Sequence, residues 1–131
     1  SEQNLWAGTY VSGAINFTYE LSPEFKVMNS FAKQYSYDQG LNGYEVDVFT
    51  YNNELVFSTD MGLKKKIYKN DTLLFYPDTT FGASFSNNTR LIYRLKEDNF
   101  HNVWMYAPIR NAINSEPLGF VKPHNNIYNI R

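Results

Sequence analysis

The residues that could hold a metal ion are few. The chain has 131 residues, no cysteine and two histidines, His101 and His124. Zinc sites need cysteine or histidine ligands at short, defined spacings, and neither an HExxH nor a CxxC pattern occurs. The segment 38–43 resembles a calcium loop, but Gly40 replaces a ligand and Phe49 stands where the bidentate glutamate belongs. The sequence therefore predicts no metal ion and no cofactor.

The sequence also offers little for catalysis. The segment 82–86, Gly-Ala-Ser-Phe-Ser, differs from the Gly-x-Ser-x-Gly nucleophile elbow in its last residue. Glu45 and Asp47 share one face of an expected strand, and Glu54 begins the next strand. Carboxylates placed in this way are usually the solvated side of a sheet rather than the pair that a glycosidase uses. An enzyme is therefore the less favoured class.

The clearest basic cluster is Lys64, Lys65 and Lys66, with Tyr68 close behind. Lysines beside an aromatic platform are typical of proteins that bind single-stranded nucleic acid. Lysines on a short strand also protect the edge of a sheet from aggregation. Because the net charge of the chain is −1, the electrostatic drive for nucleic-acid binding is weak, and we favour edge protection.

Aromatic residues are unusually frequent, at 18% of the chain. Trp104 and Tyr106 lie on one face of an expected strand, and such side chains combine rigid contact area with a polar tip. They suit protein interfaces and carbohydrate platforms, and a small domain cannot bury all its aromatic side chains. The candidate binding residues are Trp104, Tyr106, Tyr68, Lys64, Lys65 and Lys66.

The elements that must position these residues are mostly β-strands. In the segment 14–21, apolar residues alternate with polar ones, and 5–11 precedes it across a turn at Ser12-Gly13. After residue 43, turn signals rich in asparagine recur roughly every 8–12 residues, a spacing typical of sandwiches and barrels. The strands expected between and after these turns are 44–51, 54–59, 63–69, 72–76, 81–86, 89–97 and 103–107.

One helix is expected within residues 22–36. Ser22 provides a hydroxyl N-cap, Pro23 occupies the first helical position, and Glu24 lies near the positive end of the helix dipole. Apolar residues then recur at spacings of three and four, the pattern of an amphipathic helix. These residues are Phe25, Met28, Phe31, Ala32 and Tyr35. Such a helix would cover one face or one end of the sheet.

Together these patterns predict a mainly β fold, an antiparallel meander that forms a small sandwich or barrel. Residues 1–107 are expected to form a single domain, and no apolar segment is long enough to span a membrane. After Pro108, prolines and isolated apolar residues replace the alternation. We therefore expect 108–131 to be an extended C-terminal arm, with short strands at 118–121 and 127–130, packed on the domain or on a neighbouring subunit.

The favoured function is a non-catalytic binding or assembly module, such as a virion component of a virus or phage, or a cell-surface adhesion domain. The expected partner is another protein or a second copy, bound through the aromatic surface and the C-terminal arm. A carbohydrate or a small apolar ligand is an alternative. The expected location is accordingly the virion or the cell exterior rather than the cytoplasm.

Two further hypotheses remain open. One is an up-and-down barrel that carries a small apolar ligand. The segment 5–10, Leu-Trp-Ala-Gly-Thr-Tyr, resembles the first-strand Gly-x-Trp motif of lipocalins, with Tyr10 in the tryptophan position and Trp6 ahead of the glycine. The other is single-stranded nucleic-acid binding through Lys64–Lys66.

Overall fold

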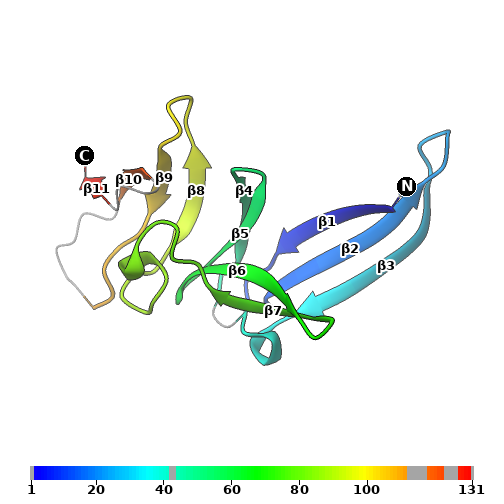
Figure 1. The fold of residues 1–131 in the computed structure, drawn as a ribbon, viewed down its shortest axis with the longest axis horizontal. Coiled ribbons are helices and arrows are strands. Elements are labelled where there is room, and N and C mark those ends of the chain that lie inside the picture. The colour runs from blue at the N-terminus through cyan, green and yellow to red at the C-terminus, as the bar shows by residue number, and fades with distance from the viewer. Residues whose placement is uncertain (1, 42–43, 112–117, 123–126, 131) are drawn as a thin grey trace.

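The chain is mainly β. The structure is a computed structural model, and it describes residues 2–41, 44–111, 118–122 and 127–130. Within these ranges it contains eleven strands in three antiparallel sheets and no α-helix (Figure 1). Two short 3₁₀ helices, η1 (Tyr37–Gln39) and η2 (Ala83–Phe85), lie between the strands. The predicted fold class is confirmed, and the described strands form separate sheets rather than a closed barrel.

The first sheet projects from the rest of the molecule. It is formed by β1 (Glu2–Gly8), β2 (Ala14–Leu21) and β3 (Val27–Tyr35), in that order. Figure 1 shows it extending to one side, with the β2–β3 loop at its far tip. We call it the projecting sheet.

The second sheet is a four-stranded meander with tight turns. Its strands are β4 (Asp47–Tyr51), β5 (Glu54–Thr59), β6 (Gly62–Lys69) and β7 (Thr72–Pro77). Asn52 and Asn53 join β4 to β5, and both have positive φ, at 50° and 62°. Two residues at positive φ form the hairpin turn whose twist matches that of the flanking strands, and asparagine tolerates this conformation. The hairpins predicted from the asparagine-rich turns are therefore present.

The third sheet contains β8 (Tyr93–Glu97), β9 (Val103–Tyr106), β10 (Leu118–Lys122) and β11 (Ile127–Ile130). Their order is β11-β10-β9-β8, and β10 pairs antiparallel with β9. The two short strands expected in the C-terminal region are thus present, and they extend the sheet beyond β9.

Two apolar cores hold the sheets together, and the second sheet contributes to both. On β5, Val56 belongs to one cluster and its neighbour Phe57 to the other, because successive side chains point to opposite faces. The first cluster joins the second and third sheets, and its buried residues are Val56, Leu63, Phe81, Phe85, Ile92, Val103, Met105 and Ala107. The second joins the base of the projecting sheet to the second sheet, and its buried residues are Ala14, Tyr35, Leu41, Val46, Phe57, Leu73 and Phe75.

The helix expected within residues 22–36 is wrong, because β3 occupies 27–35. The pairing of β2 with β3 shifts register between Thr18 and Glu20, where Asn29 has φ 48°. This bulge puts Met28 and Phe31, three residues apart, on the same face of a strand. A bulged strand therefore reproduces the spacing of three and four that otherwise indicates a helix.

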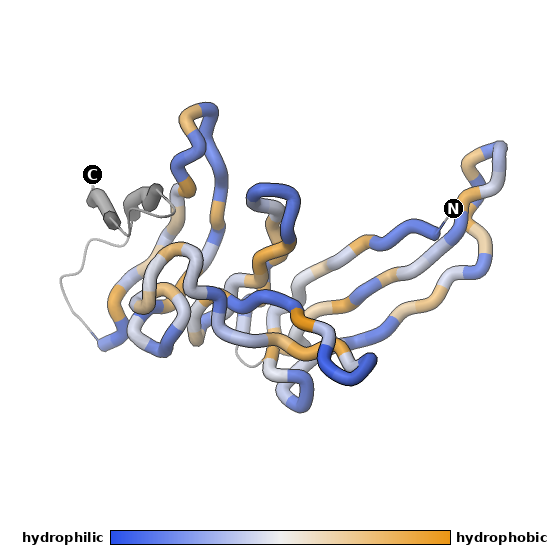
Figure 2. Tube along the Cα trace, viewed as in Figure 1, coloured by the Kyte–Doolittle hydropathy of each residue, from blue (hydrophilic) through white to orange (hydrophobic). Residues whose placement is uncertain are grey.

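Other sequence-based boundaries also needed correction. The strand expected at 81–86 is wrong, because the 3₁₀ helix η2 lies there. The segment 89–97 becomes a strand only from residue 93, and residue 90 instead forms an isolated bridge to residue 109. Figure 2 shows hydrophilic turns at the ends of the β4–β5 and β6–β7 hairpins and apolar stretches along the projecting sheet. In the described ranges, no helix has the length and apolar character needed to cross a membrane.

Candidate functional site

The predicted residues Trp104 and Tyr106 lie together at a surface cavity of about 540 Å³. They face outward from β9, whereas Val103 and Met105 alternate with them and are buried. We call this cavity the aromatic pocket. Its lining residues are Glu45, Tyr93, Arg94, Trp104, Met105 and Tyr106.

The strand pairing of β8 with β9 brings a third aromatic ring into the pocket. Tyr93 is the register partner of Tyr106, and the two ring centroids lie 6.3 Å apart with a tilt of 35°. Cross-strand neighbours on one face of a sheet contact each other in this way. Alternation along one strand predicts that the two residues of β9 lie together, but it does not predict Tyr93 beside them, because the bulge in β8 changes which of its residues face outward.

The ring of Trp104 is held in place by the β8–β9 hairpin. Its Nε1 donates a hydrogen bond of 2.8 Å to Asp98 Oδ2, and Asn102 Nδ2 donates to the same oxygen at 2.9 Å. Backbone amides of Phe100 and Asn102 donate to Asp98 Oδ1 at 2.8 and 3.0 Å. The Asn102 side chain, with Trp104 and these amides, lowers the pKa of Asp98 to about 2 because all of them favour its charged form. Trp104 is therefore a preorganised platform.

Two charged residues at the pocket have an unusual backbone. Glu45 and Arg94 have φ values of 52° and 51°. Among the other non-glycine residues with positive φ in the described ranges, all but Phe25 are Asn, Asp or His, the types that tolerate this region best. Such a conformation costs about 1–3 kcal/mol per residue and is concentrated at functional sites. The Arg94 backbone N–H donates to Asp47 Oδ2 at 3.4 Å, which helps to hold the bulge.

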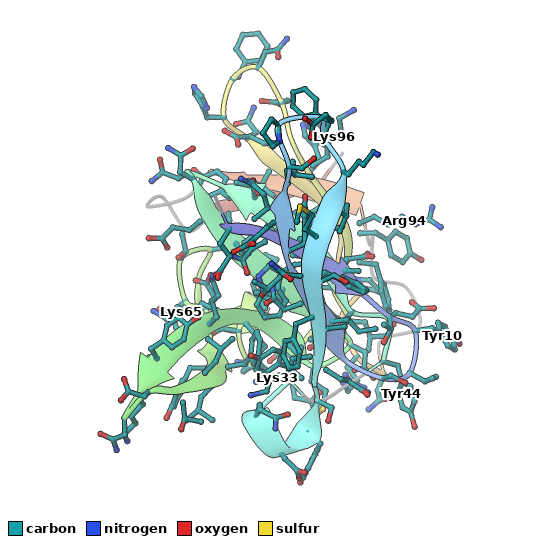
Figure 3. All side chains as sticks on the ribbon, turned by 90° about the vertical axis from the view of Figure 1, so that its right-hand side faces the viewer. Tyr10, Lys33, Tyr44, Lys65, Arg94 and Lys96 are labelled. Carbon is teal, nitrogen blue, oxygen red and sulfur yellow. The ribbon has the colours of Figure 1, made fainter. Side chains whose placement is uncertain are left out.

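The predicted lysine cluster is divided by strand alternation. Lys64, Lys66 and Tyr68 lie on one face of β6, and Lys65 lies on the other. Burial lowers the pKa of Lys64. Figure 3 shows Lys65 on the opposite side of the molecule from Arg94. The structure therefore does not unite the lysines into one basic patch or bring them to the aromatic pocket.

Lys66 and Tyr68 line a second groove, with a volume of about 450 Å³, between the projecting sheet and the second sheet. Lys66 Nζ lies 5.8 Å from the ring centroid of Trp6, within range of a cation–π interaction. The Trp6 ring itself packs against Tyr35, at a centroid distance of 5.3 Å. The groove is thus partly filled by side chains that join the two sheets.

The projecting sheet has a face that sequence analysis did not identify. Residues that are direct partners across the strands share a face, so Leu5, Phe17 and Ala32 lie together. We call this the outer face, and neither core cluster includes any of its side chains. Its other residues, assigned by the same pairing, are Gln3, Ala7, Ile15, Tyr19, Leu21, Val27 and Gln34.

The opposite, inner face carries all the charge. Glu2, Glu20 and Lys33 are the charged residues of β1, β2 and β3, and all of them fall on the inner face. The base of that face holds Trp6 and Tyr35, which pack into the core. In a one-sided antiparallel sheet the face away from the core is normally the polar one. Here all three charges lie on the core side, an inverted polarity. Leu5 and Val27 on the outer face are 56% and 62% exposed, and Phe31 and Met28, beyond the base of the inner face, are 65% and 49% exposed.

Part of this surface was visible in the sequence, because the alternation in 14–21 shows the apolar side of β2. Because a helix is expected within residues 22–36, the sequence does not predict β3 or the three-stranded projecting sheet.

The fold does not bring metal ligands together among the residues that the structure describes. In the described part of the chain, no three His, Asp or Glu residues are placed to hold a metal ion. His101 Nδ1 lies 2.7 Å from Glu97 Oε1 at the end of the β8–β9 hairpin. His124 lies outside the described residues.

Comparison with known proteins finds no matching family model, no matching curated protein and no matching solved structure.

Proposed function

We propose that the chain is a non-catalytic assembly module that associates with a second copy of itself through the outer face of the projecting sheet. The observation that carries this proposal is the inverted polarity of that sheet. Its uncharged face contributes no side chain to the core, whereas all three charged residues of its strands lie on the face whose base joins the core. Apolar surface removed from water stabilises an association by about 25 cal/mol per Å².

The size of the outer face limits the area that an interface can bury. Strands of seven to nine residues, three abreast, give a face of roughly 20–25 Å by 15 Å. Two such faces give roughly 600–750 Å² of flat area. This is less than the roughly 1,000 Å² of total buried area expected of a specific interface, so side chains of the tip must contribute as well. The dimer is therefore expected to be concentration-dependent rather than permanent.

A second copy is favoured as the occupant because the outer face is uncharged. Two-fold packing places the same patch on both partners, so a charged patch would bring like charges together. An uncharged patch avoids this repulsion, and two sheets pack face to face about 10 Å apart with side chains interdigitated. A subunit that assembles in this way suits a virion or a cell-surface layer, which is the broader assignment that we propose.

The alternative hypotheses have less support. A barrel for a small apolar ligand requires an enclosed interior, and the described strands form three sheets without closure. Single-stranded nucleic acid would need a continuous basic groove, and alternation separates Lys65 from Lys64 and Lys66.

Leu5→Lys tests the proposal, since it introduces a charge into the outer face at an exposed position on an edge strand. Burying an unpaired lysine is unfavourable, so we expect the dimer dissociation constant to rise at least about tenfold. Asn4→Lys is the matched control, because Asn4 is the exposed neighbour on the inner face. Sedimentation velocity over a range of concentrations measures the association, and circular dichroism confirms the fold of each variant.

Two results would overturn the proposal. One is a wild-type protein that stays monomeric up to about 100 µM, well above the micromolar range of weak specific complexes. The other is equal weakening by Leu5→Lys and Asn4→Lys, which would place the interface elsewhere.

A further inference from the structure

We infer that the aromatic pocket is a binding site for a neutral saccharide. This inference does not depend on self-association, because the pocket and the outer face are formed by different residues. The supporting features are three aromatic rings, two opposite charges and a rigid support.

The three rings provide platforms for the apolar faces of sugar rings. Tyr93, Trp104 and Tyr106 line the cavity, and Tyr106 is 44% exposed. Ligand sites are commonly concave, rich in aromatic side chains and equipped with a few polar groups that fix orientation. A cavity of about 540 Å³ is within the range of small-ligand sites, roughly 300–1,000 Å³.

The support behind Trp104 favours stacking over general hydrophobic contact. Asp98 accepts the Trp104 Nε1 hydrogen bond at 2.8 Å and is itself held by Asn102. A ring fixed before binding loses little conformational freedom when a ligand arrives. Trp104 lines the cavity with its Nε1 group engaged by Asp98, so its contribution to the pocket is that of a ring rather than of a hydrogen-bond donor.

The charges of the pocket favour a ligand that is polar but neutral. Glu45 and Arg94 line the cavity, and in the residues that the structure describes neither forms an ion pair. A carboxylate accepts hydrogen bonds, whereas a guanidinium donates two in parallel. Vicinal hydroxyls satisfy both groups because each hydroxyl is donor and acceptor. The opposite charges cancel, so neither an anionic nor a cationic ligand is favoured.

The backbone of these two residues is consistent with such a role. Glu45 and Arg94 both have positive φ, in a region that residues of their types rarely adopt. They come from segments about 50 residues apart in sequence, before β4 and within β8, yet they line one cavity. Strain at both sides of one pocket is expected where the fold positions functional groups.

The two tryptophan indoles give an internal comparison for the test. Trp104 lines the aromatic pocket, whereas Trp6 lines the groove beside Lys66. We propose to titrate the ¹⁵N-labelled chain with cellohexaose, chitohexaose and maltohexaose, and to follow both indole N–H resonances. The expected result is a saturable shift of the Trp104 resonance with at least one of them, at a dissociation constant on the order of 1 mM, while the Trp6 resonance does not move.

Variants then locate the binding. Tyr106→Ala removes an exposed ring from the pocket and should raise the dissociation constant about tenfold. Tyr68→Ala is the matched control, because Tyr68 is an exposed tyrosine, at 70%, that lines the other groove. Asp98→Asn tests a positioning role, since it should weaken binding and also broaden or shift the Trp104 resonance in the absence of saccharide.

Several outcomes would overturn the inference. One is a Trp104 resonance that responds to none of the three saccharides, and another is an equal shift of both indole resonances. Equal weakening by Tyr68→Ala and Tyr106→Ala would also contradict it. A saturable shift with decaproline alone would assign the pocket to a proline-rich peptide, which also docks on aromatic grooves. The Leu5→Lys variant should bind saccharide as the wild type does, so failure of self-association and failure of this site are separable.

Discussion

The projecting sheet and the second sheet are both antiparallel and built from hairpins, yet they use their faces in different ways. The second sheet contributes buried side chains to both core clusters, from opposite faces of β5. The projecting sheet contributes to only one cluster, and only from the base of its inner face. The first arrangement stabilises the monomer. The second leaves apolar side chains such as Leu5 and Val27 exposed, and the proposed self-association rests on them.

The hairpin tips of the projecting sheet and of the third sheet also differ. Phe25 at the β2–β3 tip and Phe100 at the β8–β9 tip are 82% and 81% exposed. The β8–β9 tip is organised by Asp98, which accepts several hydrogen bonds. The β2–β3 tip is closed mainly by Ser22, which accepts backbone hydrogen bonds from Phe25 and Lys26. The β8–β9 tip holds Trp104 of the aromatic pocket in place. The β2–β3 tip instead exposes Phe25 at the end of the outer face.

The largest expected effect is on the free energy of unfolding, and it distinguishes a substitution in the second sheet from one in the projecting sheet. Phe57→Ala removes a fully buried ring that packs at 4.8 Å, centroid to centroid, from Phe75. The resulting cavity should lower the free energy of unfolding by about 3–5 kcal/mol. Phe17→Ala on the outer face should lower the unfolding free energy of the monomer by less than about 1.5 kcal/mol, because Phe17 is only half-buried and lies outside both core clusters.

Urea denaturation at low protein concentration measures both changes. Similar losses for Phe57→Ala and Phe17→Ala would mean that the outer face is part of the monomer core, and the comparison between the two sheets would be wrong.

The hairpins of the second sheet can be predicted from the sequence, whereas the strand β3 of the projecting sheet cannot, for a physical reason. The hairpins of the second sheet are evident because Asn52-Asn53 and Asn70-Asp71 mark two-residue turns between alternating strands. The strand β3 is hidden because its bulge at Asn29 converts a period of two into spacings of three and four.

The candidate sites were partly visible for similar reasons. Trp104 and Tyr106 are two residues apart on a strand, so local alternation places them together. Glu45 and Arg94 line the same cavity only because of the tertiary structure, and no local sequence pattern indicates that they do so. Lys64, Lys65 and Lys66 are adjacent in the sequence, but they do not form one basic patch, because neighbouring residues of a strand point to opposite faces of the sheet.

The next prediction concerns the pH dependence of the β8–β9 tip. The folded pKa of Asp98 is about 2, below the ordinary value of 3.8. A depressed carboxyl pKa means that its stabilising contribution is fully present above the unfolded pKa, and is lost as the pH falls toward the folded value. Between pH 5 and pH 2 the wild type should therefore lose thermal stability, and the Trp104 environment should change.

The Asp98→Asn variant should show a smaller decrease in Tm over the same pH range, because the titrating group is gone. The exposed Asp38 offers a matched control, and Asp38→Asn should keep the wild-type pH profile. An unchanged pH profile in Asp98→Asn would contradict the anchoring role of this carboxylate. Differential scanning calorimetry and tryptophan fluorescence measure the two effects.

The smallest expected effect on stability compares the two exposed phenylalanines directly. Phe25→Asp and Phe100→Asp should each change the free energy of unfolding of the monomer by no more than about 0.5 kcal/mol, since both rings are largely solvated. Their effects on association should differ. Phe25 belongs to the loop between Leu21 and Val27, the pair that ends the outer face. Phe25→Asp should therefore raise the dimer dissociation constant a few-fold by adding charge at the rim of the interface. Phe100→Asp, on another sheet, should leave that constant unchanged. Sedimentation velocity of the two variants side by side distinguishes them, and weakening by Phe100→Asp alone would move the interface from the projecting sheet to the β8–β9 hairpin.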